Sequence, residues 1–306
     1  MSYAVLFSGQ GTQHPGMLPW LETEPASQPV LAALADAIGG NWRVDLEDAQ
    51  QRSRNAFAQP LITGTSLAAW AAMASALEEP PAAVAGYSVG ELPAFACAGV
   101  FSASTAIALA VQRAVGMDAA VFGLDTGLLS VSGLQMAQVL QAQPALECVI
   151  DIGADQAIYA GESAALTRSA EALSGLGALC KRLEVRVASH SHWMASAARG
   201  FATQLEALPF ARPHAALVLN ATGAGTRDPH TLRHALSTQI DHRVQWAASM
   251  DAVAEQGVAC VIEVGAGTTL SKMWNQRHPA VPARSLDEFR DAAGAARWIA
   301  RSARRD

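Results

Sequence analysis

The chain has 306 residues, of which 51% are hydrophobic and 16% are charged. This length and composition suffice for a large buried core and indicate either one large α/β domain or a main domain carrying an insert. The formal net charge is −6 and no block of five like charges occurs, so the sequence lacks the basic patch typical of nucleic-acid or membrane-surface binding.

The N-terminus and the cysteines favour a cytoplasmic protein. Residues 1–7 form too short an apolar run for a signal peptide and lack its basic start. The alanine-rich residues 67–77 fall short of the ~20 residues that a membrane span requires. The four cysteines occur singly, without CxxC spacing, which favours free buried thiols over disulfides or a metal site. They are Cys97, Cys148, Cys180 and Cys260.

The first predicted element is a buried strand at residues 3–7, which leads into a glycine-rich loop at residues 8–17. The loop has neither the GxGxxG nor the GxxxxGK[ST] spacing, so it is a weak nucleotide signal. Its N–H groups could instead face a catalytic crevice, because open α/β sheets collect their sites at the carboxyl ends of strands. Helical patterns follow at residues 26–38 and, after Gln59-Pro60-Leu61, at residues 65–77.

The most informative stretch is Gly86-Tyr87-Ser88-Val89-Gly90, which lies between an apolar run at residues 81–85 and an amphipathic stretch at residues 91–98. A strand, a GxSxG turn and a helix together present a serine hydroxyl at a helix N-terminus. Free N–H groups there stabilise a developing oxyanion, and a nearby base activates the serine. A glycine-rich strand-to-helix connection is the structural alternative. The flanking elements favour a catalytic serine without defining the reaction.

Arg113 is the second candidate. Ser102 or Ser104 is expected to cap a helix over residues 103–119, whose apolar residues spread over more than one face and predict that it is largely buried. A buried arginine needs an anionic or carbonyl partner. It could reach solvent or pair with a structural carboxylate, which the residue alone favours, or its guanidinium could hold the carboxylate of a substrate.

From about residue 126 the pattern changes to short strands and helices. Strands are expected at residues 128–132, 147–152, 157–161 and 179–187, and helices at 135–142 and 162–174. The order β-α-β-β-α-β is typical of a ferredoxin-like unit. We therefore predict an α/β fold in which residues 1–121 and 188–306 form a hydrolase-like catalytic core with a parallel sheet, and residues 122–187 form an inserted ferredoxin-like subdomain.

The chain returns from this insert with two histidines, His190 and His192. No His, Cys or carboxylate cluster with ligand spacing lies nearby, so we expect no metal. His190 is a candidate base for Ser88, although a structural or surface role is the alternative for any histidine and is expected for His192. Further core strands are predicted at residues 217–220 and 261–264, a helix at 244–253, and a basic helical tail at 298–305 on the surface.

A series of motifs between residue 9 and about residue 270 resembles the malonyl-CoA:acyl-carrier-protein transacylase family. One such motif is weak, but the ordered set is highly specific. In chain order the motifs are Gly9-Gln10-Gly11-Thr12-Gln13 with Gly16-Met17, Gln59-Pro60, the GxSxGE elbow ending at Glu91, Arg113 with Met117, Ser189-His190, Asn220, Val244-Gln245-Trp246 and Glu263-Val264-Gly265-x-Gly267. The predicted insert also lies where that family has it.

The resemblance implies a serine–histidine dyad. Ser88 would be the nucleophile and His190 its base, and the backbone carbonyl of Gln245 would orient the imidazole. The backbone N–H groups of Gln10 and Val89 would form the oxyanion hole.

The resemblance also implies the substrates. Arg113 would hold the free carboxylate of malonate, and an unpaired buried arginine would discriminate against acetyl-CoA. Malonyl-CoA would be the donor, the phosphopantetheine-type thiol of an acyl carrier protein the acceptor, and no metal or other cofactor would take part. Four basic residues could face an acidic carrier, namely Arg168, Lys181, Arg182 and Arg186.

Two departures from the family pattern bear on specificity. Tyr87 stands where the family commonly has His. In this position the chain resembles the epsilon-type transacylase subunit of malonate decarboxylase, which loads malonyl onto that complex's own carrier subunit. Residues 187–190 are intermediate between patterns for different acyl groups, whereas the branched Val89 favours malonyl over methylmalonyl.

Three alternatives remain open. They are a serine thioesterase or esterase, a fatty-acid or polyketide acyltransferase with another acyl specificity, and an inactive binding subunit. A hydrolase would normally carry its catalytic histidine late in the chain and an HGGG-like oxyanion loop. Here the candidate base His190 is followed by a long stretch of core, and no HGGG occurs.

Overall fold

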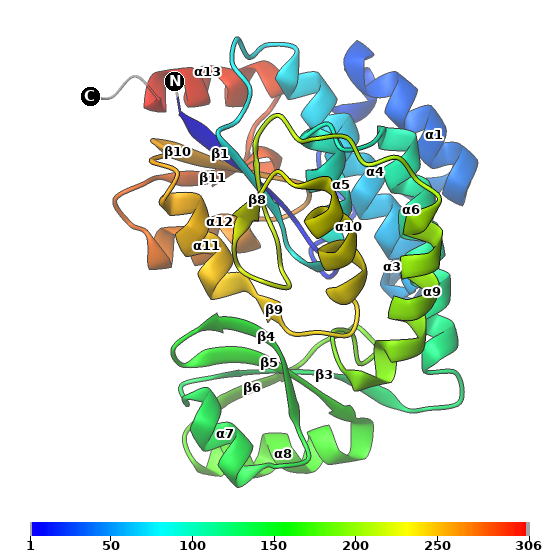
Figure 1. Cartoon of the computed structure of the whole chain (residues 1–306), viewed down its shortest axis with the longest axis vertical. Coiled ribbons are helices and arrows are strands. Elements are labelled where there is room, and N and C mark those ends of the chain that lie inside the picture. The colour runs from blue at the N-terminus through cyan, green and yellow to red at the C-terminus, as the bar shows by residue number, and fades with distance from the viewer. Residues whose placement is uncertain (1, 304–306) are drawn as a thin grey trace.

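The computed structural model describes residues 2–303 and contains two sheets (Figure 1). The larger sheet has the strand order β11-β10-β1-β2-β7-β8, parallel except for β8, which runs antiparallel to β7. Its strands in chain order are β1 (Tyr3–Phe7), β2 (Ala83–Gly86), β7 (Ala216–Val218), β8 (Gly225–Thr226), β10 (Cys260–Val264) and β11 (Ala283–Ser285). Strands β1, β2 and β10 are buried along their whole length, as expected for parallel strands that are covered on both faces.

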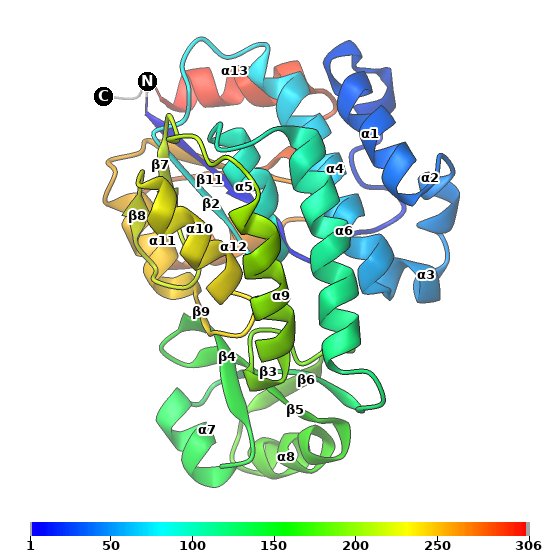
Figure 2. The ribbon, with the colours of Figure 1, turned by 45° about the vertical axis from the view of Figure 1, so that its right-hand side comes forward.

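Helices cover both faces of this sheet (Figures 1 and 2). On β1, Val5 and Phe7 join the hydrophobic cluster under α4, α5 and α6, whereas Leu6 joins the cluster that holds Trp246 and Trp274. The helices of this part are α1 (Gln28–Ile38), α2 (Trp42–Asp45), α3 (Ala49–Ser53), α4 (Asn55–Ala74), α5 (Glu91–Cys97), α6 (Ala103–Ala120), α9 (Ala195–Glu206), α10 (Pro229–Thr238), α11 (Trp246–Ala254), α12 (Thr269–Arg277) and α13 (Ala292–Ser302).

The second sheet has the order β6-β3-β5-β4-β9. It comprises β3 (Thr126–Ser132), β4 (Glu147–Gly153), β5 (Gln156–Glu162), β6 (Leu179–Arg182) and β9 (Val244–Gln245), with α7 (Met136–Ala142) and α8 (Ser163–Gly175). The α/β fold class with an inserted β-α-β-β-α-β unit is confirmed. The boundaries at residues 122 and 187 stay a prediction, and one strand from outside them, β9, pairs in parallel with β4.

Several predicted elements differ from the observed ones. Helix α4 begins at Asn55 instead of residue 65 and contains Pro60, a residue that disfavours helix interiors. Burial of all residues from Phe57 to Ala69 offsets this cost. Strand β6 ends at Arg182 instead of residue 187.

Two further expectations about burial were wrong in part. The tail expected on the surface belongs to α13, whose Ile299 is buried against the core, while its last residues, 304–306, lie outside the described chain. Helix α6 buries Arg113, as expected for a largely buried helix, but leaves Val115 58% exposed. Within residues 2–303 no helix combines the length and the hydropathy needed to cross a membrane.

Candidate active site

The predicted strand–turn–helix arrangement is present around Ser88. Strand β2 ends at Gly86, a single 3₁₀ turn spans Ser88–Gly90, and α5 follows directly. Ser88 has a φ of 56°, a left-handed conformation that non-glycine residues adopt at a cost. Glycines flank it because the backbone is crowded: a Cβ on Gly86 would lie 1.9 Å from the carbonyl oxygen of Gly90.

His190 lies within hydrogen-bond reach of this serine. Its Nε2 is 2.7 Å from Ser88 Oγ, and its Nδ1 is 2.5 Å from the backbone carbonyl oxygen of Gln239. If Nδ1–H donates to that carbonyl, Nε2 keeps its lone pair for the serine proton. The backbone N–H of His190 also donates to the carbonyl of Ile240, at 2.9 Å. The structure therefore brings the predicted pair together.

The prediction that Gln245 orients His190 was wrong, since Gln239 supplies that carbonyl. Val244 and Gln245 are not the first turn of α11 but strand β9, which is paired to β4. The Gln245 carbonyl accepts instead from Ser249 Oγ at 2.9 Å. No motif marks Gln239, which follows the last residue of α10, so only the three-dimensional path of the chain reveals it.

Burial controls the charge of His190. The side chain is 1% exposed, and this burial, together with the positive charge of Arg113, lowers its pKa from 6.5 to about 3. The imidazole is therefore neutral at physiological pH. A neutral imidazole with a free Nε2 is the form that a general base requires.

Arg113 is 2% exposed, and no carboxylate among residues 2–303 forms a salt bridge with it, although the nearby Glu91 acts to raise its pKa. Its Nη1 donates to Gln59 Oε1 at 2.7 Å and its Nη2 to Gln239 Oε1 at 3.4 Å. Its Nε has no hydrogen-bond partner among the described residues. Burial lowers the pKa of Arg113 to about 10, which leaves the guanidinium charged at neutral pH. Two neutral amide oxygens compensate this charge only in part, so the site favours an added anion.

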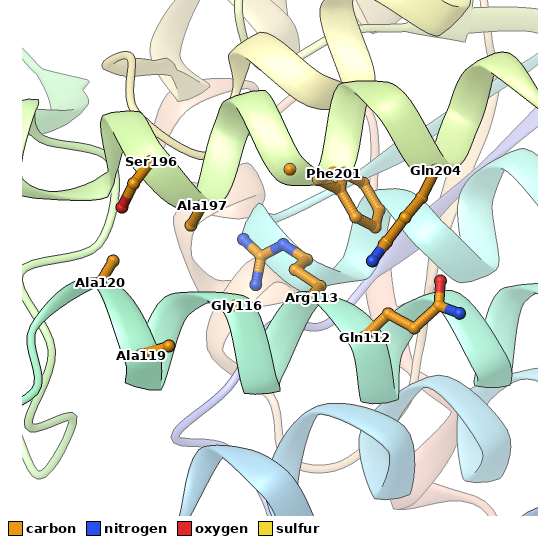
Figure 3. Close-up of a pocket in the computed structure, with 10 residues that line it drawn as sticks. Gln112, Arg113, Gly116, Ala119, Ala120, Ser196, Ala197, Phe201 and Gln204 are labelled. Atoms are coloured by element: carbon orange, nitrogen blue, oxygen red, sulfur yellow. The ribbon is translucent and has the colours of Figure 1, made fainter.

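Gln239 joins the two parts of the site. Its backbone carbonyl faces His190 and its side-chain oxygen accepts from Arg113. A hollow of about 260 Å³ lies beside Arg113, between α6 and α9, with Gly116, Ala197 and Phe201 in its wall. Figure 3 shows the Arg113 guanidinium extending from α6 towards α9. Ser88 and His190 do not line this hollow.

The glycine-rich loop passes close to the serine turn. A Cβ on Gly9 would lie 2.6 Å from the carbonyl oxygen of Tyr87, so glycine permits this approach. The next residue, Gln10, is fixed by a 2.9 Å hydrogen bond from its side chain to Asn55. Val89 lies in the first turn after the strand, where N–H groups lack helical acceptors. The oxyanion role of the Gln10 and Val89 N–H groups stays a prediction.

Other motif residues have structural contacts. Glu263 accepts from the Ser8 hydroxyl and from the backbone N–H groups of Leu270 and Ser271 in the first turn of α12. Tyr87 packs edge-on against Trp246 with ring centroids 5.1 Å apart. His192 is exposed and its Nδ1 contacts Glu147, as expected for a surface histidine.

Comparisons with known proteins identify the family of this chain. The acyl transferase domain family matches residues 5–294. The malonyl CoA-acyl carrier protein transacylase of Salmonella typhimurium is 30% identical over 298 residues, covering 94% of this chain and 96% of that protein. The protein of the same name from Mycobacterium bovis is 32% identical over 289 residues, covering 92% and 95%.

Solved structures show the same fold. The acyl-carrier-protein-S-malonyltransferase of Bartonella henselae superposes with a TM-score of 0.90 at 26% identity, covering 98% of this chain and 100% of that one. A malonyl-transacylase in complex with a type II PKS acyl-carrier protein gives a TM-score of 0.89 at 27% identity, covering 97% and 99%. The resemblance seen in the sequence is thereby confirmed, and the chain belongs to the acyl transferase domain family.

Proposed function

We propose that this protein transfers a malonyl group from malonyl-CoA to the phosphopantetheine thiol of an acyl carrier protein, through a malonyl ester of Ser88. The observation that carries the proposal is the 2.7 Å contact of Ser88 with His190, whose orienting residue, Gln239, also binds the guanidinium of Arg113. A nucleophile, a neutral base and a buried cation are thus linked in one site. The names of the similar transacylases support the same reaction.

The first half-reaction forms the acyl-enzyme. His190 Nε2 accepts the Ser88 proton as Oγ attacks the thioester carbonyl. The resulting oxyanion would accept hydrogen bonds from the backbone N–H groups of Gln10 and Val89. Collapse of the tetrahedral intermediate breaks the carbon–sulfur bond, and the CoA sulfur leaves with the proton from His190.

The second half-reaction reverses these roles. The carrier thiol gives its proton to His190 and attacks the ester carbonyl, and Ser88 Oγ leaves and recovers that proton. The neutral His190 serves both directions, since it accepts a proton from each nucleophile and returns it to each leaving group.

Arg113 would select the acyl group. The malonyl carboxylate would supply the anion that the two amide oxygens only partly replace. An acetyl group would leave the buried charge in its present state, so it would gain nothing from this residue.

The test is to incubate the protein with malonyl-CoA, with and without a phosphopantetheine-bearing acyl carrier protein. We expect malonyl-carrier, and not free malonate, to be the product when the carrier is present. Ser88→Ala should abolish this transfer. Rapid release of free malonate and CoA, without malonyl-carrier, would instead support a thioesterase. Transfer at the wild-type rate by Ser88→Ala would remove Ser88 from the mechanism.

Two finer assignments are separate proposals. The malonate decarboxylase type rests on Tyr87 alone and is tested by offering that complex's carrier subunit beside a fatty-acid carrier protein. A cytoplasmic location is proposed from the unpaired cysteines, three of which are buried. No cofactor besides the substrates is proposed.

A further inference from the structure

Asn220 is a buried polar residue that contacts the nucleophile's backbone but takes no part in the mechanism above. We propose that Asn220, itself held by Glu91, is a positioning residue that keeps Ser88 in its reactive conformation. The inference rests on the proposed role of Ser88 as nucleophile and extends it to two further residues.

The side-chain amide of Asn220 bridges both ends of the serine turn. Its Oδ1 accepts from the backbone N–H of Ser88 at 2.8 Å, and its Nδ2 donates to the carbonyl of Gly86 at 2.5 Å. These are the groups that the end of a strand and the start of a helix leave without regular partners. Asn220 is 0% exposed, so water cannot take over either bond.

Glu91 in turn fixes Asn220. Its Oε1 accepts from the backbone N–H of Asn220 at 2.7 Å, while the Asn220 carbonyl accepts from the N–H of Gln245 at 2.8 Å. Glu91 is the first residue of α5, the helix that follows the serine turn. The helix thus returns a side-chain carboxyl group, whose pKa burial raises to about 8, to the residue that holds the turn. Ser88, Asn220 and Glu91 form one hydrogen-bonded network.

The network acts on the conformation that the reaction needs. Ser88 has φ of 56°, which costs on the order of 1–3 kcal/mol for a non-glycine residue. The two hydrogen bonds of the Asn220 side-chain amide offset that cost at Ser88, the residue whose Oγ contacts His190. Because Asn220 also occupies the Ser88 N–H, the next N–H along, that of Val89, is the one left for the oxyanion. Loss of the network would let the turn relax and move Oγ away from Nε2.

The test compares Asn220→Ala with a matched control, Asn275→Ala. The side-chain amide of Asn275 also makes two hydrogen bonds to backbone, donating to the carbonyl of Ala283 and accepting from its N–H. Asn275 lies on α12 and not at the serine turn. The readouts are thermal unfolding, kcat and KM for malonyl transfer, and the rate at which a fluorophosphonate modifies Ser88. The last reports on the serine alone and does not depend on the acyl group.

We expect Asn220→Ala to lower both kcat and the phosphonylation rate by about 100-fold, with KM for malonyl-CoA unchanged, because misplacement by about 1 Å costs rates of this order. Asn275→Ala should lower the unfolding temperature with no change in either rate. Glu91→Gln, which keeps an acceptor oxygen for Asn220, should retain most of the rate, whereas Glu91→Ala should not. The double variant Glu91→Ala/Asn220→Ala should be no slower than Asn220→Ala alone, since the residues act as a unit.

A folded Asn220→Ala protein that is phosphonylated at the wild-type rate would overturn the proposal. If Asn220→Ala does not fold, the Glu91 pair decides: equal phosphonylation rates for Glu91→Gln and Glu91→Ala would overturn it as well. A wild-type protein whose Ser88 reacts with the fluorophosphonate, and slows as expected on substitution, but which transfers no malonyl group, would refute the proposed function alone.

Discussion

A neutral imidazole and a charged guanidinium share one glutamine in the interior of this protein. Arg113 contributes to keeping His190 deprotonated, because its positive charge disfavours a second one nearby. The same charge makes the site suited to a carboxylate-bearing substrate. Arg113 therefore affects both the base and the specificity, and the two effects can be measured separately.

The pH profile of the free enzyme tests the first effect. The pKa of His190, about 3, lies below its ordinary 6.5, so the neutral base persists as the pH falls through 6.5. We expect kcat/KM for malonyl-CoA to stay level down to about pH 5. Arg113→Ala should move the acid limb to higher pH, because it removes one of the two causes of the low pKa. A wild-type limb centred near 6.5 would contradict this.

Acyl selectivity tests the second effect. Arg113→Ala should lower kcat/KM for malonyl-CoA by about 30-fold or more, corresponding to about 2–5 kcal/mol for a lost buried charge pair. Acetyl-CoA should be affected far less, so the ratio of the two values should fall. Arg233→Ala is the control, since Arg233 lies on α10 and donates to the carbonyls of Leu205, near the end of α9, and of Leu208, just after it. A ratio unchanged by Arg113→Ala would exclude carboxylate recognition by this residue.

The serine turn depends on how closely its strands and helix approach. A Cβ on Gly90 would lie 2.4 Å from the carbonyl oxygen of Phe7 on β1, and one on Gly86 would lie even closer to its neighbours. Neither contact can relax cheaply, because backbone atoms would have to move. These glycines therefore allow the turn that carries Ser88 to pack closely against the central strand β1.

Glycine substitutions should therefore have opposite effects in different elements. Gly86→Ala should lower the free energy of unfolding by about 3 kcal/mol or more, as expected for overpacking of a rigid core. Gly200→Ala, on α9 where nothing lies within 4 Å of the new Cβ, should raise it by about 0.5–1 kcal/mol through helix propensity. Denaturant unfolding measures both, and equal effects would show that the crowding around Gly86 is not limiting.

Elements with a strong local signal could be predicted from the sequence. Strand β1 matches residues 3–7, because a parallel strand buried on both faces reads as a continuous apolar run. The serine turn and the insert also carry local patterns. Helix α4 could not be delimited, since Pro60 signals a boundary that burial overrides.

Contacts between residues that are distant in the sequence could not be predicted from it. Gln239 and Gln245 are both plausible sources of a carbonyl near His190. Only the folded chain decides between them: the Gln239 carbonyl lies 2.5 Å from His190 Nδ1, whereas Gln245 lies in β9, which pairs with β4 about a hundred residues earlier in the chain. The roles of Gln59 and Asn220 depend in the same way on distant partners.

Carrier recognition concerns the surface of the entire protein. A formal net charge of −6 would repel an acidic carrier, so productive docking has to use local positive charge. Arg168, Lys181, Arg182 and Arg186 are all exposed on or just after α8 and β6. Arg182 and Arg186 line a hollow together with Asp125 and Glu184, which balance them in part.

Charge reversal tests this surface. Lys181→Glu/Arg186→Glu should raise the KM for an acidic carrier by about 10-fold and weaken its salt dependence, because electrostatic steering is lost. The rate of CoA release from malonyl-CoA should not change. Arg212→Glu, an exposed arginine outside this region, should leave the carrier KM as it is. A carrier KM unaffected by the double reversal would remove this surface from docking.

In the proposed mechanism one serine, Ser88, carries the acyl group between two thiols. Mass spectrometry of the protein after brief exposure to malonyl-CoA, followed by a chase with a phosphopantetheine-bearing carrier, measures this step directly. We predict a malonyl ester on the peptide that contains Ser88, which disappears as malonyl-carrier forms and is absent in Ser88→Ala. Malonyl-carrier that forms with no such ester, or an ester that the carrier cannot discharge, would contradict the mechanism.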